Sequence, residues 1–192
     1  MSRAGAALPL LELPDRAALR EWFEHNHAVS PGVHIAVANK GSDATLLTYE
    51  DAIQEAVAFG WIDSTAHALD AGRHTVMLVP RRRRGTWSAS NKARLELLSG
   101  AGLMTPAGQA AVEAAKEDGS WTSLDDVEAM LVPDDLAAAL AADPEAARGW
   151  ENTTASQRKM TLHWIASAKR AETRSRRVSE SVRAAAEGRR LW

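Results

Sequence analysis

Residues 47–91 constrain the fold more than any other stretch, because a capped helix, two strands and a second helix start follow one another there. Thr48 with Asp51 three residues later is typical of a helix N-terminus. Apolar side chains then recur at helical spacing up to Gly60, which accepts the left-handed backbone at which helices often end. This segment therefore predicts an amphipathic helix with one face turned toward a core.

Two strands are predicted directly after this helix. Residues 61–69 and 74–79 are rich in β-forming side chains, and Asp70-Ala71-Gly72 has the composition of a turn. Pro80 lacks an N–H group and ends the ladder. Because side chains alternate along a strand, Trp61 and Asp63 share one face. We therefore expect an antiparallel hairpin, from whose end residues 81–84, all arginine, emerge.

The N-terminal part adds further strands and a helix. Residues 10–13 predict either a short edge strand or an entry segment, Asp15 caps a helix, and residues 33–38 predict another strand. Residues 1–9 are expected to be disordered, and Leu46-Leu47 to be a short extended approach to the central helix. Together with the hairpin, these segments predict a small sheet of mainly antiparallel character flanked by helices.

Beyond residue 91 the sequence predicts helices almost throughout. We expect alanines 107, 110, 111, 114 and 115 to face inward on a helix that begins at Thr105-Pro106. A later helix begins at Thr153 or Thr154. The predicted fold class is α+β, with an α+β domain over residues 1–120 and a helical C-terminal lobe over residues 121–192 packed on it. The later helix is expected to turn the following residues to one face: Gln157, Met160, Thr161, Trp164, Ile165 and Ala168.

Several classes of protein are excluded by composition. No apolar run approaches the roughly 20 residues that span a bilayer, and residues 1–13 lack the pattern of a secretory signal. The chain has no cysteine, which excludes disulfides and thiolate chemistry, and we expect a cytoplasmic protein. Residues 158–192 carry ten Lys or Arg against three Glu, or +7, which leaves −9 for residues 1–157 within a net charge of −2.

The first candidate site joins Trp61 and Asp63 to Arg81 or Arg82. An aromatic wall, a carboxylate and a guanidinium at the rim of a sheet can stack a planar group and hold a charged one. Alternatively, Asp63 and Arg81 form an ion pair between the strands while Trp61 fills the core. Arginines 81–84 either bind phosphate or carboxylate, with about two of them acting together, or form a solvated loop.

The second candidate site is Trp87-Ser88-x-x-Asn91, which places a hydroxyl and an amide beside the same pocket or simply caps the next helix. The pair His25-x-His27 lacks the spacing of a zinc site, so we expect neither metal nor cofactor. The basic residues between Lys169 and Arg177 either contact nucleic acid or anionic lipid, or form a solvated face that partly packs against the acidic body.

Five segments together resemble a known family: LTYEDAIQEAVAFGWIDS, VPRRRRGTWSASN, GLMTPAGQAAVEAAK, VPDDLAAAL and HWIASAKRAETRSRRV. The sequence resembles the YdeI/OmpD-associated family, which carries the label bacteriocin protection, from Trp22 to Val182. The resemblance implies a role in tolerance of antimicrobial peptides or envelope stress and supplies no catalytic residues. The matching positions are Tyr49, Gly60, Trp61, Asp63, Pro80, Arg81, Trp87, Ser88, Asn91, Trp164, Ile165, Lys169, Thr173, Arg174 and Arg177.

These observations predict a non-enzymatic protection protein of the stress-response or antimicrobial-resistance type in a bacterium. It binds a toxic small molecule or antimicrobial peptide in a Trp-lined cleft, and nucleic acid is not the expected partner. One alternative is an enzyme with Asp63 as acid or base and Arg81 or Arg82 holding an anionic substrate. Another is a nucleic-acid or envelope-surface adaptor that uses the basic C-terminal helices. The predicted ligand-binding residues are Tyr49, Trp61, Asp63, Arg81, Arg82, Trp87, Ser88 and Asn91.

Overall fold

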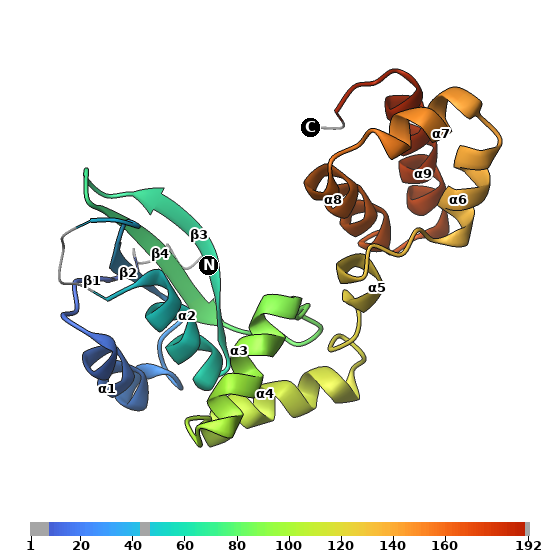
Figure 1. The fold of residues 1–192 in the computed structure, drawn as a ribbon. Coiled ribbons are helices and arrows are strands. Elements are labelled where there is room, and N and C mark those ends of the chain that lie inside the picture. Colours follow the sequence, from blue (N-terminus) through green and yellow to red (C-terminus); the bar gives the residue numbers. More distant parts are fainter. Residues whose placement is uncertain (1–7, 43–46, 191–192) are drawn as a thin grey trace, which may run out of the picture. The chain divides into compact units, whose positions relative to one another are not determined.

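The computed structural model describes residues 8–42 and 47–190 and divides into two compact units (Figure 1). The sheet unit is Met1–Trp121 and the helical unit is Thr122–Trp192. The disorder expected for residues 1–9 is wrong for Leu8 and Pro9, because the Pro9 carbonyl accepts a hydrogen bond from the His34 N–H at 2.9 Å. Residues 1–7, and Leu46 with its expected extended conformation, lie outside the described residues.

The sheet has four strands in the order β1-β2-β4-β3. Strand β1 (Leu10–Leu11) runs parallel to β2 (Val33–Ala38), whereas β2 and β3 (Trp61–Ala68) are both antiparallel to β4 (Arg73–Pro80). The mainly antiparallel sheet is therefore confirmed. A bulge interrupts the pairing of β3 with β4 between Asp63 and Ala66, and bulges of this kind bend an edge strand.

Four helices complete the sheet unit: α1 (Arg16–Asn26), α2 (Tyr49–Ala58), α3 (Ala89–Gly100) and α4 (Pro106–Glu117). Their starts are set by local hydrogen bonds, as the sequence predicted. The Asp15 carboxylate accepts from the Ala18 N–H, and Thr48 forms a complete capping box with Asp51. Gly60 has a φ of 74°, the left-handed backbone expected where α2 ends.

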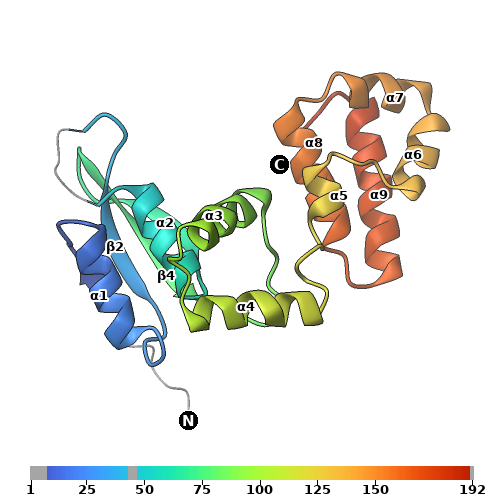
Figure 2. The same cartoon turned by 60° about the horizontal axis from the view of Figure 1, so that its bottom comes forward.

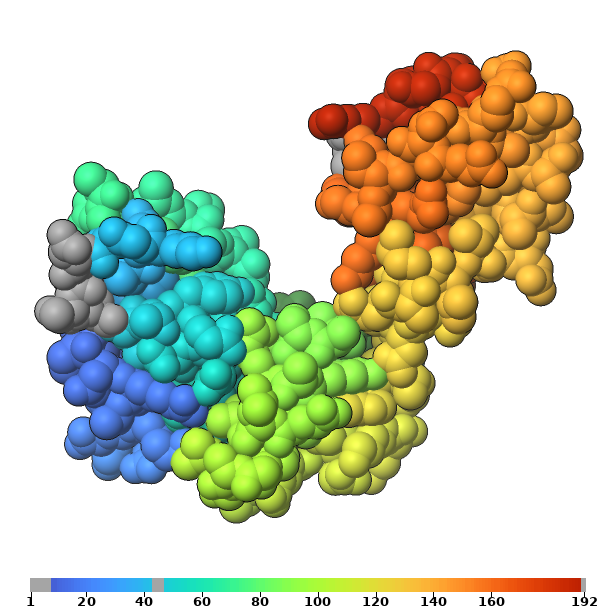
Figure 3. Space-filling model, in the orientation of Figure 1, coloured from blue at the N-terminus to red at the C-terminus, as the bar shows by residue number. Residues whose placement is uncertain are grey.

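The core of the sheet unit forms where α1 and α2 cover one face of the sheet (Figures 1 and 2). Aromatic rings dominate it: Phe23 stacks on Phe59 with centroids 5.1 Å apart and meets Trp61 edge-on at 5.2 Å. Trp22 meets Trp61 edge-on at 5.9 Å. In the space-filling view the side chains of this unit pack closely on the face shown (Figure 3). Strand residues from the same face complete the core: Val33, Ile35, Val37, Val76 and Leu78.

A buried carboxylate joins the first two helices. Glu55 on α2 is only 1% exposed and accepts hydrogen bonds from Arg16 Nε at 2.6 Å and Arg20 Nη1 at 3.0 Å, both on α1. Burying a charge is costly unless it is paired and hydrogen-bonded. Two guanidiniums meet that requirement, so Glu55 fixes how α1 lies on α2.

The inward face of α4 differs from the expected alanine face. Gly108, Val112 and Ala115 are buried, whereas Ala110 is exposed. A Cβ added to Gly108 would collide with the carbonyl oxygen of Ala58 at the end of α2. Only glycine fits where the backbones of α2 and α4 come this close. With Gly108 facing α2, only some of the alanines of α4 face inward.

The helical unit contains α5 (Asp125–Glu128), α6 (Asp134–Ala141), α7 (Pro144–Glu151), α8 (Ala155–Ala166) and α9 (Ala171–Ala186). Helix α9 packs against α6, α7 and α8. Gly149 on α7 lies so close to the Ala185 carbonyl on α9 that an added Cβ would collide with it. The helical C-terminal region is therefore confirmed, with a core of its own: Val127, Leu136, Leu140, Ala146, Trp150, Leu162, Ile165 and Val178.

The expected inward face of α8 is only partly right. Thr161 and Ile165 are buried as expected, together with Leu162. Met160 is instead 46% exposed, and Trp164 is only partly buried. Apolar residues lie on both sides of this helix, so the sequence pattern does not distinguish the core side from the outer side.

Among residues 8–42 and 47–190, no helix is both long enough and apolar enough to cross a membrane.

Replacing Glu55 by Gln should destabilise the sheet unit by about 2 kcal/mol, because two hydrogen bonds between charged groups are lost from a buried position. The loss is smaller than for a fully buried pair since Arg16 and Arg20 are about 30% exposed. Urea unfolding followed by circular dichroism measures it. Glu113→Gln, which affects an exposed pair with Lys116, is the control and should change stability by a few tenths of a kcal/mol. Equal midpoints for the two variants would show that Glu55 does not hold the helices.

Gly108→Ala should destabilise the same unit by roughly 1–3 kcal/mol, because the added methyl group forces α4 away from α2. Gly100→Ala is the matched control: this glycine is also helical, but an added Cβ meets nothing within 4 Å. Alanine favours a helix over glycine by about 1 kcal/mol, so the control should be neutral or stabilising. The same urea titration compares them, and a Gly108→Ala variant as stable as the control contradicts the close-packing account.

Candidate functional site

All eight predicted ligand-binding residues lie in the sheet unit. Tyr49 opens α2, Trp61 and Asp63 lie on β3, and Ser88 and Asn91 lie at the start of α3. Pairing of β3 with β4 places Trp61 opposite Pro80, which directly precedes Arg81 and Arg82. The fold thus brings the segments together, whereas the side chains divide into separate contacts.

Both tryptophans of the predicted cleft are buried. Trp61 and Trp87 are each 1% exposed. Trp61 is enclosed by core aromatic rings, and Trp87 lies between the guanidinium of Arg81, 3.5 Å from its ring centroid, and the ring of Trp121 at 5.2 Å. The two indoles therefore contact protein, and neither offers a face to solvent.

Asp63 is hydrogen-bonded to tyrosine. The Tyr49 hydroxyl donates to Asp63 Oδ2 at 3.0 Å, and the Tyr49 ring stacks on His74 with centroids 6.4 Å apart. Burial raises the pKa of Tyr49, and the Asp63 charge raises it further. Within the described part of the chain, no ion pair joins Asp63 to Arg81, so the interstrand ion pair weighed as an alternative is absent.

Arg81 is held by Trp87 and by the backbone. Its Nη1 donates to the Thr86 carbonyl at 3.2 Å, whereas Nε and Nη2 are buried without a hydrogen-bond partner. Burial lowers the pKa of Arg81 to about 10, and the nearby charge of Asp63 acts in the opposite direction. Arg82 is exposed. The four arginines therefore differ in role, and Arg81 is the one built into the structure.

Ser88 caps α3, as one of the two interpretations held: its Oγ accepts from the Asn91 N–H at 3.3 Å. The Asn91 side chain accepts from Arg94 Nη1 at 3.1 Å. Arg94 also makes a two-pronged pair with Glu50, with Nε and Nη2 at 2.9 and 2.7 Å from the two carboxylate oxygens. Arg94 holds the pKa of Glu50 below its usual range. Sequence reasoning missed this pair, since only the packing of α2 on α3 brings it together.

The rings of His25 and His27 are hydrogen-bonded to their own helix. His25 donates its Nδ1–H to the Glu21 carbonyl, and His27 donates its Nδ1–H to the Phe23 carbonyl. Among the described residues no group of three His, Cys, Asp or Glu could hold a metal ion.

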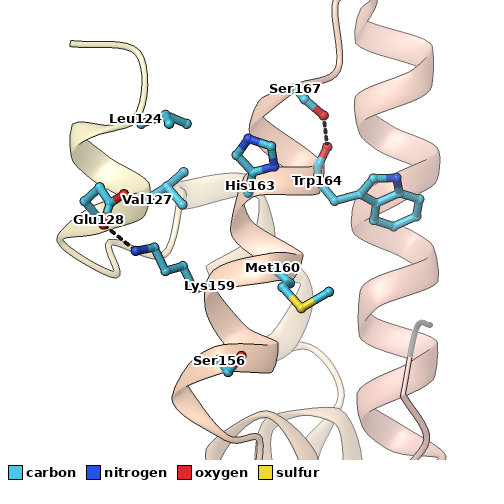
Figure 4. A pocket seen from close by; sticks show the side chains of 9 residues that line it. All are labelled: Leu124, Val127, Glu128, Ser156, Lys159, Met160, His163, Trp164 and Ser167. Atoms are coloured by element: carbon cyan, nitrogen blue, oxygen red, sulfur yellow. Dashed lines mark hydrogen bonds and ion pairs between the residues drawn. The ribbon is translucent and has the colours of Figure 1, made fainter. Parts of the chain in front are cut away.

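A pocket of about 590 Å³ lies in the helical unit between α5 and α8 (Figure 4). Leu124 and Val127 line it from the side of α5, and Met160 and Trp164 line it from α8. Met160 and Trp164 lie on the side of α8 that faces away from the core, and the same side of α8 lines this pocket. The remaining lining residues are Glu128, Ser156, Lys159, His163 and Ser167.

The polar groups of this pocket are mostly engaged with protein. Lys159 forms an ion pair with Glu128, and the Ser167 hydroxyl donates to the Trp164 carbonyl at 2.9 Å (Figure 4). On the side of α9, the guanidinium of Arg177 lies 5.1 Å from the Trp164 ring centroid and donates to Ser167 Oγ at 2.8 Å. These contacts fix the indole at the edge of the pocket.

Comparison with known proteins gives two family matches. Residues 11–111, more than half of the 192-residue chain, match the family described as Domain of unknown function (DUF8412). The chain belongs to this family. The DUF8412 match covers β1 to the first part of α4 and therefore includes all eight residues of the predicted ligand site. No curated protein and no solved structure matches the chain.

The second match lies outside the DUF8412 region. Residues 129–188 match the family described as Bacteriocin-protection, YdeI or OmpD-Associated. This confirms the resemblance for the C-terminal part, whereas residues 11–111 carry the DUF8412 match instead. Six of the nine residues that line the α5–α8 pocket fall within 129–188. Ligand binding by the eight residues in the DUF8412 region stays a prediction, as does the acid–base alternative for Asp63.

Titration of Tyr49 can be followed by tyrosinate absorbance, because the chain has one tyrosine. Its pKa should lie above the usual value near 10. Since the folded state binds this proton more tightly, the contribution to stability is present below the unfolded pKa and is lost as pH rises through the folded pKa.

Asp63→Asn should lower the pKa of Tyr49 toward its ordinary value, because the carboxylate charge disappears. Asp70→Asn removes a carboxylate that pairs with Arg73 and is the control. Identical tyrosinate titration curves for the native protein and Asp63→Asn would contradict the described contact.

Proposed function

We propose that this protein protects a bacterial cell by binding a toxic small molecule or peptide reversibly, in the α5–α8 pocket of the helical unit. The observation that carries the proposal is the pocket itself. Its volume of about 590 Å³ lies within the usual range for ligand sites, and its lining is mainly apolar. It lies largely in the region that matches a family described as bacteriocin-protection.

The chemistry of the lining supports binding over catalysis. Met160 is flexible and polarizable, which suits contact with ligands of different shape, and Trp164 supplies a large ring with a fixed position. Glu128 and Lys159 neutralise one another, and Ser167 is hydrogen-bonded to backbone and to Arg177. A ligand would be held chiefly by apolar contact, with His163 and Ser156 among the exposed polar groups of the lining.

The proposed pocket shares no residue with the cleft predicted from the sequence and lies in the other unit. Trp61 and Trp87 are buried, whereas Trp164 is partly exposed beside the pocket. A cytoplasmic location also remains part of the proposal.

The decisive experiment compares Met160→Glu with Leu97→Glu. Both residues are exposed apolar side chains, 46% and 69% exposed, so both variants should fold, but Leu97 lies on α3 of the sheet unit. A sensitive bacterium expressing each form is challenged with a panel of bacteriocins and small antibiotics, and purified proteins are titrated with the same compounds by calorimetry. Met160→Glu should weaken binding by about tenfold or more, because a bound ligand would cover this exposed apolar side chain, and burying such a side chain fully contributes roughly 1.5–3 kcal/mol.

Leu97→Glu should protect and bind like the native protein. If Met160→Glu, like Leu97→Glu, binds the compounds with native affinity and gives native survival, the pocket is not the binding site. No protection and no binding by the native protein against the whole panel would remove the function.

A further inference from the structure

Within the described residues, three adjacent arginines just after β4 form no ion pair, although the charge of Arg83 acts on the nearby Asp118 carboxylate. Arg82, Arg83 and Arg84 are exposed, and in the described part of the chain none forms an ion pair. Other arginines do: Arg94 binds Glu50 and Arg174 binds Asp135, each through Nε and Nη2. Exposed charge of one sign is therefore concentrated at the end of β4.

The loop that carries these arginines has a defined shape. The Arg84 N–H donates to Asp118 Oδ2 at 2.9 Å, and the Gly85 N–H donates to the Arg82 carbonyl at 3.1 Å. Arg84 has a φ of 60°, which non-glycine residues seldom adopt. Asp118 holds the loop backbone and also accepts from the Ser120 N–H at 3.0 Å. Because the backbone is already fixed, only the three side chains have to be ordered when they engage a partner.

Further cations surround the aromatic pair beneath the loop. Trp87 carries Arg81 on its ring and meets Trp121 at 5.2 Å. Lys92 and Lys116 lie over the Trp121 ring, 4.8 and 5.9 Å from its centroid. Lys116 also pairs with Glu113 at 3.0 Å. Trp121 is partly exposed, so this surface combines part of an indole with lysines and exposed guanidiniums.

We propose that this surface, which we call the arginine-loop surface, binds the phosphate backbone of single-stranded nucleic acid. Guanidinium forks match phosphate oxygens, and exposed arginines beside a partly exposed indole are the combination by which single strands are held without sequence preference. The loop sequence RRRRGT has no apolar side chain that could enter a bilayer, which disfavours a lipid surface. The surface is defined by Arg82, Arg83, Arg84, Lys92, Lys116 and Trp121.

The C-terminal helices hold more basic residues but are a weaker candidate. Arg174 is paired with Asp135, and Arg177 donates to the Trp164 carbonyl and Ser167. Glu172, Glu180 and Glu187 are interleaved with the remaining arginines of this region. Several basic side chains of residues 158–192 are thus engaged within the protein, although the segment keeps a net charge of +7, whereas the arginine loop holds three guanidiniums without an ion pair on adjacent residues.

The test measures fluorescence anisotropy of a fluorescein-labelled oligothymidylate of about 20 nucleotides with the full chain, at salt concentrations between about 50 and 200 mM. Binding should be saturable at low salt. If three to four phosphates are neutralised, the slope of log K against log salt should be about −2 to −3. Arg82→Ala/Arg83→Ala/Arg84→Ala should weaken binding at least about tenfold and flatten the slope by about 2.

The matched control is Arg170→Ala/Arg176→Ala/Arg183→Ala, which removes the same charge from exposed positions on and beside α9. Its affinity should stay within about threefold of native. Arg83→Glu alone is a second variant in case the triple change disturbs the loop, and it should also weaken binding about tenfold. Circular dichroism verifies that all variants fold.

Equal losses in both triple variants overturn the proposal, because binding would then follow total charge. Absence of saturable oligonucleotide binding at low salt also overturns it, including the case in which vesicles of phosphatidylcholine and phosphatidylglycerol, or polyglutamate, bind instead. Met160→Glu should leave oligonucleotide binding unchanged, so failure of the pocket proposal and failure of this one are distinguishable.

Discussion

Burial of Trp61 is the constraint on which the sheet unit depends. The residue follows the left-handed Gly60, so the chain turns sharply out of α2 and places the indole against Phe23 and Trp22 on α1. The Arg81 N–H then donates to the Gly60 carbonyl at 3.0 Å, which fixes the end of β4 beside the same turn. One packed ring thereby sets the positions of two helices and two strands. A large aromatic side chain that does this cannot also form the wall of an open cleft.

Local signals in the sequence predicted the elements well because their causes are local. Thr48 with Asp51 and Thr154 with Gln157 form complete capping boxes, and Gly60 ends α2 as expected. Which side of a helix faces inward was harder, since this depends on partners far along the chain. On α8, Met160 and Leu162 are both apolar, yet only Leu162 packs in the core. The candidate site shares this limit: the segments around Asp63 were predicted to converge, but exposure of Trp164 and burial of Trp61 and Trp87 followed from tertiary packing.

The two units carry different kinds of functional information. The sheet unit contains the whole DUF8412 match, whose description names no activity. Polar contacts in this unit are used within the fold, as with Tyr49 and Asp63. The helical unit contains the match to the bacteriocin-protection family and the apolar pocket. Each unit has its own hydrophobic core. A function assigned to one unit therefore does not extend to the other by family membership alone, and evidence for each has to come from its own side chains.

Arginine shows how little residue counts reveal about a surface. Arg94 and Arg174 are bound by carboxylates through their forks, Arg81 lies on Trp87, and Arg16 and Arg20 neutralise buried Glu55. In each case the guanidinium is engaged by another group of the protein. Where that group is a carboxylate, the two charges cancel, and the arginine attracts an anionic partner only weakly. The C-terminal segment is the most basic by sequence, with a net charge of +7 over residues 158–192, but Arg174, Arg177 and Arg189 are engaged by neighbouring groups of the protein. An anion can bind only those basic side chains that the packing leaves without an ion pair. For this reason the short loop at residues 82–84 is a better candidate anion site than the long basic helix α9.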